Sequence, residues 1–266
     1  MIAVLHRRPG REIADRRTRG GRLLHVGTLL RVCGLAAVRA LFETDPARVE
    51  RLFFEPRLRS EAGRFCAMLA RVRRPYREVE EGELTRVAGT VLHGGIAAIA
   101  QPRPLDAFDP AAAPGWARDG KPLLILDGIG NPHNLGAIAR TAAFFGVERM
   151  LLADRPEQAL PSDASYRVAE GGLEHLTLYQ ATLPAALAGL RQGYRIVGAA
   201  LDLGAPLASR PAGKPPALIL GNEEKGLDPA TLAACDEIVT IPGSGRMQSL
   251  NVGAAAAILI YLATGP

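Results

Sequence analysis

The sequence predicts an α/β protein in which a small N-terminal α/β unit precedes a larger domain built on a parallel sheet. Apolar runs of strand length alternate with helical segments along most of the 266-residue chain. From residue 123 onward these runs are continuously apolar, which is typical of parallel strands that are covered on both faces. A stretch with five prolines, 102–122, separates the two series. We therefore predict a basic flexible tail, a small α/β unit, a linker and a larger α/β domain, at residues 1–24, 25–101, 102–121 and 122–266.

The tail is rich in arginine and glycine and has too little apolar material to pack. In the unit that follows, the periodicity switches repeatedly between helix and strand. The expected helices are 34–43, 60–72 and 81–89, and the expected strands are 51–55, 76–80 and 96–101.

The C-terminal series has longer apolar runs, with helical segments between most of them. The expected strands are 123–127, 149–153, 194–200, 216–221 and 237–241, and a last helix is expected from about 249 to 263. This pattern predicts the parallel sheet of the larger domain.

Composition excludes several classes of protein. With 48% hydrophobic and 22% charged residues, the chain has the balance of a soluble globular protein. Its longest apolar run, 254–263, is too short to cross a bilayer, and the N-terminus lacks the apolar core of a signal peptide. We expect a cytoplasmic protein with no membrane partner. The three cysteines and five histidines show no ligand spacing, so we expect no metal.

The positive charge is concentrated at the front of the chain. Residues 1–90 contain 19 arginines, no lysine and 11 acidic residues, a balance of +8, whereas the whole chain carries +5. Arginine makes bidentate contacts to phosphate and stacks on bases, so this bias favours RNA as a partner. The alternative is a solvated surface in a protein that simply uses arginine often.

The segment "LDGIGNPHNLGAIAR", 126–140, could be a dinucleotide-binding turn. It lacks the third glycine of that fingerprint, because His133 stands there, and Pro132 removes a backbone donor that would face a pyrophosphate. An NAD-dependent oxidoreductase is therefore the weaker alternative. On a helix, Leu135 and Ile138 would face the sheet, and Arg140 would project toward whatever the preceding loop binds. Arg140 could equally be a surface residue paired with an acid.

Two later stretches resemble known motifs together with this one. The blocks N-P-x-N-x-G-A-I-x-R, G-N-E-x-x-G-L and I-P-(loop)-S-L-N-V are similar, in order and spacing, to the three motifs of the SpoU (TrmH) family of RNA ribose 2'-O-methyltransferases, over about 122–264. The N-terminal unit resembles the ribosomal-protein-like RNA-binding domain of that family. The resemblance implies a trefoil-knotted SPOUT catalytic domain, a homodimer, S-adenosyl-L-methionine as cofactor, and tRNA or rRNA as substrate.

The resemblance also implies site residues. Those on the side of the ribose hydroxyl are Asn134, Arg140, Glu223, Ser249 and Asn251, and those at the cofactor are Leu220, Gly221, Ile241, Pro242, Met247 and Leu250. The family's motif-one arginine has been proposed as the general base. A guanidinium has a pKa above about 12, so freeing it near neutral pH would cost about 7 kcal/mol. We therefore expect Arg140 to clamp a phosphate and stabilise the developing alkoxide.

The other matched residues have expected roles of their own. Asn134 would orient the ribose or Arg140, Glu223 would order the motif loops, and Ser249 and Asn251 would cap the last helix while lining the pocket. Loop bracing alone is the alternative for Glu223 and Asn251. Gly243, Met247 and Gly253 depart from the residues usual in the family, which affects the pocket walls. A non-catalytic RNA-binding dimer with the same fold is the main alternative function.

Overall fold

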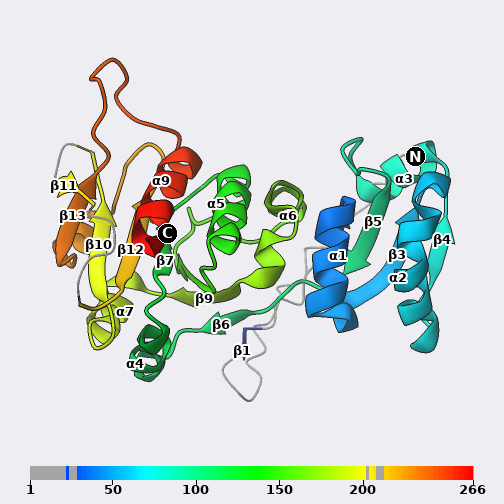
Figure 1. Cartoon of the computed structure of the whole chain (residues 1–266), viewed down its shortest axis with the longest axis horizontal. Helices are drawn as coiled ribbons and strands as arrows, with labels where there is room; N and C mark the ends of the chain where they lie inside the picture. The colour runs from blue at the N-terminus through cyan, green and yellow to red at the C-terminus, as the bar shows by residue number, and fades with distance from the viewer. Residues whose placement is uncertain (1–21, 24–28, 202–203, 208–212, 266) are drawn as a thin grey trace, which may run out of the picture.

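A computed structural model describes residues 22–23, 29–201, 204–207 and 213–265, which form two α/β units lying side by side (Figure 1). The predicted tail, 1–24, lies outside these residues except for Arg22–Leu23, which form strand β1. No helix in this part of the chain is long and apolar enough to cross a membrane.

The N-terminal unit is a four-stranded sheet with helices packed on it. Its strands run in the order β2-β5-β3-β4, and its core includes the stacked rings of Phe42 and Phe65, 4.6 Å apart. The six segments expected from the sequence are all present, and β2 is an additional strand. The elements are β2 (Leu30–Cys33), α1 (Leu35–Thr44), β3 (Val49–Phe54), α2 (Arg59–Arg71), β4 (Tyr76–Glu78), α3 (Glu81–Ala88) and β5 (Ile96–Ala100).

The second unit is built on a nine-stranded sheet in the order β1-β6-β9-β8-β7-β12-β10-β13-β11. Every neighbouring pair is parallel except β1 and β6, so the predicted parallel sheet is confirmed. Its remaining strands are β6 (Leu105–Ala107), β7 (Leu123–Asp127), β8 (Arg149–Ala153), β9 (Thr177–Ala181), β10 (Arg195–Ala199), β11 (Ala205–Pro206), β12 (Pro216–Gly221) and β13 (Glu237–Thr240).

Helices cover both faces of this sheet because its central strands are apolar on both sides. In β7, Leu124 and Leu126 belong to one core cluster, whereas Leu123 and Ile125 belong to another, as the alternation of side chains along a strand requires. The first cluster packs under α5 and α9, and the second under α7. The helices of this unit are α4 (Ala113–Trp116), α5 (Pro132–Phe144), α6 (Asp163–Ala169), α7 (Leu183–Leu190), α8 (Pro229–Ala233) and α9 (Val252–Thr264).

The strand order differs from that of dinucleotide-binding proteins. In those folds the six central strands run 3-2-1-4-5-6. Here β12, the fifth of the central strands in the chain, lies between β7 and β10, and the order becomes 3-2-1-5-4-6. The NAD-dependent alternative therefore has no support from the fold.

The stretch predicted as a linker, 102–121, is part of the second unit. It contributes β6, which pairs with β9, and α4, whose Trp116 ring lies 4.6 Å from the ring of Tyr179. Its prolines do not prevent this, because Pro110 and Pro114 lie at helix starts, where a missing N–H costs nothing. The prolines of this stretch thus mark helix starts as well as a chain connection.

The two units are joined by a polar contact inside a continuous apolar core. Arg48 of the N-terminal unit donates from Nη1 to Oε2 of Glu174 at 2.7 Å, and their side chains are only 7% and 1% exposed. Burial raises the pKa of Glu174 against the opposing charges of Arg48 and Arg103. The backbone N–H of Arg31 also donates to Oδ1 of Asp163 at 2.8 Å. The N-terminal unit is therefore docked firmly on α6 and the turn that follows it.

Candidate active site

The first motif forms the turn between β7 and α5. Gly128 has φ +83°, a left-handed conformation that favours glycine and turns the chain at the end of the strand. Asn131 is the N-cap of α5, and its side chain accepts a hydrogen bond from the N–H of His133 at 2.8 Å. Pro132 occupies the first helical position, where its fixed φ suits the helix. This local chemistry places Asn134 in the first turn of α5.

Glu223 holds this turn from the second motif. Its Oε1 accepts from the side-chain amide of Asn134 at 2.8 Å and from the N–H of Asn131 at 3.3 Å, and its Oε2 accepts from the N–H of Gly130 at 3.2 Å. Glu223 lies two residues after the end of β12, and β12 pairs with β7 up to Gly221 and Asp127. The first two motifs therefore meet at the carboxyl ends of two neighbouring parallel strands, where α/β proteins place their ligands.

These hydrogen bonds stabilise the charged form of Glu223. Partial burial opposes them, but the amide of Asn134 and the N–H groups of Gly130 and Asn131 lower the pKa of Glu223 below its ordinary value. A carboxylate held in this way is a poor proton acceptor. Its geometry is that of a brace for the turn.

Replacing Glu223 by glutamine is expected to lower the free energy of unfolding by about 1 kcal/mol at pH 7, because the side chain is exposed and loses charge-assisted hydrogen bonds. A lowered pKa stabilises the fold above the ordinary value of 4.5, and this contribution is lost as the pH falls below it. Urea denaturation from pH 7 to pH 4 should show the gap between wild type and variant closing. Glu224→Gln, a neighbouring change without side-chain partners in the described residues, should show no such gap.

The third motif joins the same network through Asn251. Its Nδ2 donates to Oδ1 of Asn134 at 3.1 Å, and its Oδ1 accepts from the N–H of Gly253 at 2.9 Å. Asn251 is thus the N-cap of α9, which begins at Val252, later than the residue 249 expected from the sequence. Ser249 is exposed and makes no hydrogen bond to another described residue, so the expected capping role fits Asn251 alone.

Arg140 lies apart from this network. It is on α5, about 1.7 turns beyond Asn134, and its Nη1 lies 2.9 Å from Oε1 of Glu170. Both side chains are more than half exposed. The structure therefore brings together Asn134, Glu223 and Asn251, whereas Arg140 is paired with Glu170 at an exposed position.

The residues expected at the cofactor do not form one enclosed pocket. Leu220 is buried in the core, and Gly221 packs so closely on the turn after it that an added Cβ would lie 2.3 Å from the backbone of Gly226. Met247 and Leu250 are 80% and 50% exposed on the loop between β13 and α9. Figure 1 shows this loop projecting from the domain. Ile241 and Pro242 stand at its base, at the end of β13.

The projecting loop makes few hydrogen bonds of its own. Among the described residues, its backbone groups from 242 to 250 make a single hydrogen bond, from the N–H of Arg246 to Oγ of Ser244 at 3.5 Å. Free backbone donors and acceptors can bind the edge of an adenine ring, and Met247 and Leu250 can cover its faces. The residues present therefore fit a cofactor with an adenosine moiety.

Two residues that hold the turn at Gly128 were not predicted from the sequence. Gln158 is buried, and its Oε1 accepts from the N–H groups of Gly128 and Ile129 at 3.0 and 3.2 Å. Asn222 donates to the carbonyl of Gly128 at 2.7 Å and accepts from the N–H groups of its own turn. Asn222 lies within the second motif, which was a usable signal. Nothing in the sequence around Gln158 indicates its role.

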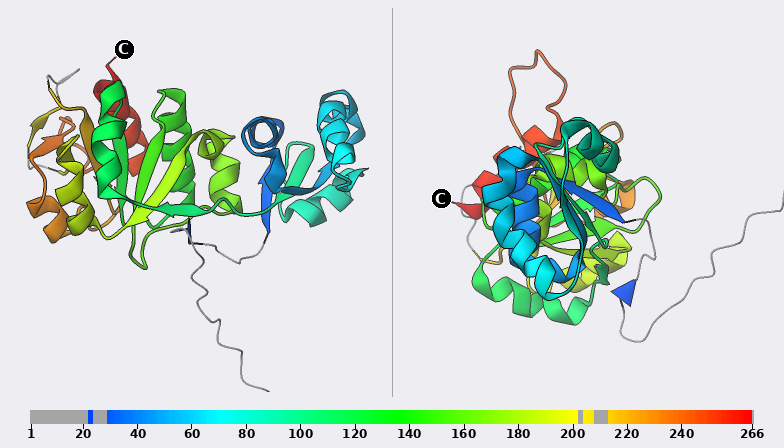
Figure 2. Two further views of the ribbon diagram at one scale, coloured as in Figure 1. Left: turned by 90° about the horizontal axis from the view of Figure 1, so that it is seen from below. Right: turned by 90° about the vertical axis from the view of Figure 1, so that its right-hand side faces the viewer.

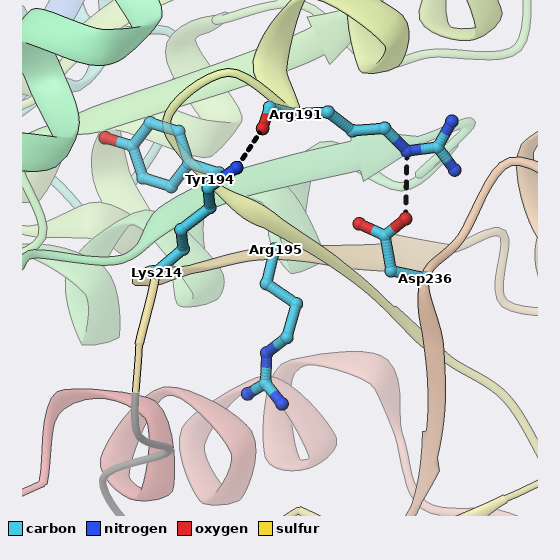
Figure 3. A pocket seen from close by; sticks show the side chains of 5 residues that line it. All are labelled: Arg191, Tyr194, Arg195, Lys214 and Asp236. Carbon is cyan, nitrogen blue, oxygen red and sulfur yellow. Dashed lines mark hydrogen bonds and ion pairs between the residues drawn. The ribbon is translucent and has the colours of Figure 1, made fainter.

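A hollow lies at the opposite end of the sheet's strands (Figure 3). Arg195 begins β10, so the hollow is at the amino ends of the parallel strands, opposite the motifs. Its polar groups serve one another: Arg191 donates to Asp236 at 2.9 Å, and Lys214 donates to the carbonyl of Arg191 at 2.6 Å. In Figure 3 the side chain of Arg195 points away from both. This hollow therefore does not compete with the motif cluster as an active site. No group of three or more potential metal ligands occurs in the described ranges.

Comparison with protein families divides the chain in two. A model of the SpoU rRNA Methylase family matches residues 121–261, and a model described as RNA 2'-O ribose methyltransferase substrate binding matches residues 31–105. The first match contains the whole motif cluster, and the second coincides with the four-stranded unit.

Curated relatives cover most of the chain. It is 32% identical over 232 residues to the "Uncharacterized tRNA/rRNA methyltransferase YfiF" of Escherichia coli O157:H7, which is 86% of this chain and 66% of that protein. It is also 32% identical over 236 residues to the "23S rRNA (guanosine-2'-O-)-methyltransferase RlmB" of Acinetobacter baylyi, which is 86% of this chain and 94% of the relative. The chain thus spans just under two thirds of the first relative and nearly all of the second.

Solved structures share the fold. An rRNA methyltransferase from Sinorhizobium meliloti superimposes with a TM-score of 0.72 at 21% identity, over 89% of this chain and 86% of the other. A TrmH-family RNA methyltransferase structure from Porphyromonas gingivalis gives a TM-score of 0.64 at 26% identity, over 88% of each chain. Both alignments extend across the two units.

Proposed function

The chain belongs to the SpoU rRNA methylase family, and on that basis we infer that it transfers a methyl group from S-adenosylmethionine to a ribose 2'-hydroxyl of tRNA or rRNA. The observation that carries this inference is the hydrogen-bonded cluster of Asn134, Glu223 and Asn251. These residues come from three separate motifs and meet at the carboxyl ends of β7 and β12. The four-stranded unit beside them is the part of the chain that binds the RNA.

We propose a different role for each residue of the site. S-adenosylmethionine supplies an electrophilic methyl group when bound, and the hydroxyl must be aligned with that group and lose a proton. Asn134 is held by Glu223 and Asn251, yet keeps one N–H and one lone pair for the ribose. Arg140 would exchange Glu170 for a phosphate of the RNA and stabilise charge on the ribose oxygen. Glu223 orders the turn and is not the base.

The cofactor would lie against the projecting loop. Ile241, Pro242, Met247 and Leu250 would contact the adenine and ribose, and the free backbone groups between them would bind the ring edge. Leu220 and Gly221 would form the floor beneath. Gly243 and Gly245 allow the backbone to approach closely.

Calorimetry with S-adenosylhomocysteine tests the cofactor, and mass-spectrometric mapping of ribose methylation tests the substrate. We expect one molecule bound per protomer, and the loss of one methylated ribose in tRNA or rRNA when the gene is deleted. NAD binding in its place would support the oxidoreductase. RNA binding with neither ligand would support the passive RNA-binding module, and an unchanged methylation map would contradict a stable-RNA substrate.

We also propose that the protein acts in the cytoplasm, where its RNA substrates are made.

A further proposal is that the catalytic domain is trefoil-knotted. Support for the knot comes from β12, which lies between β7 and β10 although β10 precedes it in the chain. Unknotted sheets can also insert a later strand between two earlier ones, so this order is compatible with a knot without requiring one. General folding rules make knots rare, so the family carries much of this proposal.

A homodimer through α5 and α9 is proposed from the apolar residues that these helices expose. Phe144 is 81% exposed, Tyr261 49% and Ile258 39%. Ile258 and Tyr261 lie on one face of α9. The ring of Phe145 lies 5.8 Å from that of Tyr261 and 5.0 Å from that of Phe144, so it links the three exposed side chains into one patch. Arg140 is one turn before Phe144, which places it at the rim of the proposed interface.

Replacing Phe144 by aspartate is expected to convert the dimer to a monomer without unfolding it. Residue 144 is exposed in a single chain, so the fold tolerates a charge there, whereas the proposed dimer would bury that charge between two chains. Sedimentation velocity at micromolar concentration measures this. Val91→Asp, an equally exposed apolar position in the N-terminal unit, should leave the dimer intact. A Phe144→Asp protein that sediments like the wild type would contradict this interface.

A further inference from the structure

The turn after α6 is wedged between the two units of the protein. Gly171 has φ +99°, and a Cβ added there would lie 2.8 Å from Cβ of Ala40 on α1. A Cβ on the next residue, Gly172, would lie 2.7 Å from Cα of Arg140 on α5. Glycine alone lets the turn fit, so the backbone 170–172 fills the space between the RNA-binding unit and Arg140.

The same turn also holds the side chain of Arg140. Glu170 is one of two residues other than glycine with positive φ in the described residues, at +46°. This conformation ends α6 and directs its carboxylate to the guanidinium of Arg140, at 2.9 Å. A strained backbone at a residue with a side chain often marks a functional position. The turn therefore contacts Arg140 twice, through the backbone of Gly172 and through the carboxylate of Glu170.

The N-terminal unit forms ion pairs with residues on both sides of the turn 170–172. Asp163, at the start of α6, binds Arg31 at 3.0 Å, and Glu174, two residues after the glycines, binds Arg48 at 2.7 Å in a buried pair. Figures 1 and 2 show α1 facing α6 across the junction. Any shift in how the unit docks would therefore move the turn, and with it Arg140.

We propose that the turn 170–172 positions Arg140 relative to the RNA-binding unit, with Glu170 as the positioning residue of the guanidinium. The inference rests on the proposed function, since it takes Arg140 to contact the RNA. RNA bound to the N-terminal unit then meets an arginine at a set distance from that unit. The docking contact becomes part of catalysis, because a displacement near 1 Å at a reacting group can lower the rate about 10²-fold.

Gly171→Ala tests the wedge in the full-length protein. We expect kcat at saturating RNA to fall about 10²-fold, with the KM for RNA and the Kd for S-adenosylhomocysteine unchanged. Gly120→Ala is the matched control, because Gly120 has φ +70° but open space around it, and it should keep full activity. The double variant Ala40→Gly/Gly171→Ala removes the contact at 2.8 Å and should restore part of the rate, because the contact with the carbonyl oxygen of Ala36 and the strain of an alanine at φ +99° remain. Full activity in Gly171→Ala, or no recovery in a folded double variant, would overturn the proposal.

Glu170→Gln tests the ion pair if the glycine variant does not fold. We expect kcat to fall about fivefold, the upper limit for an exposed pair, with an unchanged unfolding midpoint. An unchanged kcat with tighter RNA binding would mean that Glu170 merely competes with phosphate, which overturns the positioning role. A wild-type protein that methylates no RNA would contradict the proposed function itself, whereas an active wild type matched by both variants would overturn only this inference.

Discussion

Replacing Arg48 by methionine is expected to lower the free energy of unfolding by about 3 to 5 kcal/mol, because it leaves Glu174 charged and almost fully buried without its main partner. The second oxygen of Glu174, Oε1, already has no hydrogen-bond partner in the structure. Chemical denaturation at pH 7 measures the loss. Replacing both residues, as Arg48→Met/Glu174→Leu, should recover most of the stability, since apolar side chains of similar volume suit the buried junction.

The pH dependence of the unfolding free energy of Arg48→Met tests whether the buried charge of Glu174 causes the loss. Burial already raises the pKa of Glu174 above its ordinary value of 4.5, and removing Arg48 raises it further. A carboxyl that binds its proton more readily in the folded state destabilises the protein as the pH rises above the ordinary value. The deficit should therefore be smallest near pH 4.5 and grow toward neutral pH. Arg77→Met, which breaks an exposed pair with Glu83, should cost no more than about 1 kcal/mol.

Elements with long apolar runs were predictable from the sequence, and short mixed ones were not. The strand 123–127 was expected and is found as Leu123–Asp127, since five consecutive buried residues leave a clear pattern. The strands Leu30–Cys33 and Thr177–Ala181 were missed, because each has four or five residues that mix polar and apolar side chains. Their place depends on pairing with distant partners. Helix α9 was expected three residues too early, because Asn251 is its cap.

The residues of the candidate site were likewise predictable only in part. The motifs indicated Asn134, Glu223 and Asn251, and the structure joins their side chains by hydrogen bonds. The sequence allowed an acidic partner for Arg140 but did not identify it as Glu170. Glu170 reaches Arg140 through a left-handed backbone and a glycine turn packed on another domain. Such a contact depends on tertiary packing, which no local pattern reports.

Replacing Arg140 by alanine is expected to lower kcat for RNA methylation by about 10² to 10³-fold, the usual cost of removing one donor that stabilises charge in a transition state. Arg140→Lys keeps the charge but loses the planar pair of donors, and should fall between wild type and alanine. Methyl transfer from labelled S-adenosylmethionine to purified RNA at saturating substrate measures both. The free energy of unfolding should change little, because the ion pair with Glu170 is more than half exposed.

Arg118→Ala is the matched control for Arg140. This arginine is exposed on the short turn after α4, which precedes the amino end of β7, whereas α5 follows the carboxyl end of that strand. Its loss should leave kcat unchanged. S-adenosylhomocysteine should bind every variant as it binds the wild type, since Arg140 is assigned to the RNA. If Arg140→Lys keeps full turnover and RNA affinity, the bidentate contact to phosphate is wrong. If Arg140→Ala also keeps them, the residue is only the partner of Glu170, and the ribose oxygen must be stabilised by the Asn134 cluster alone.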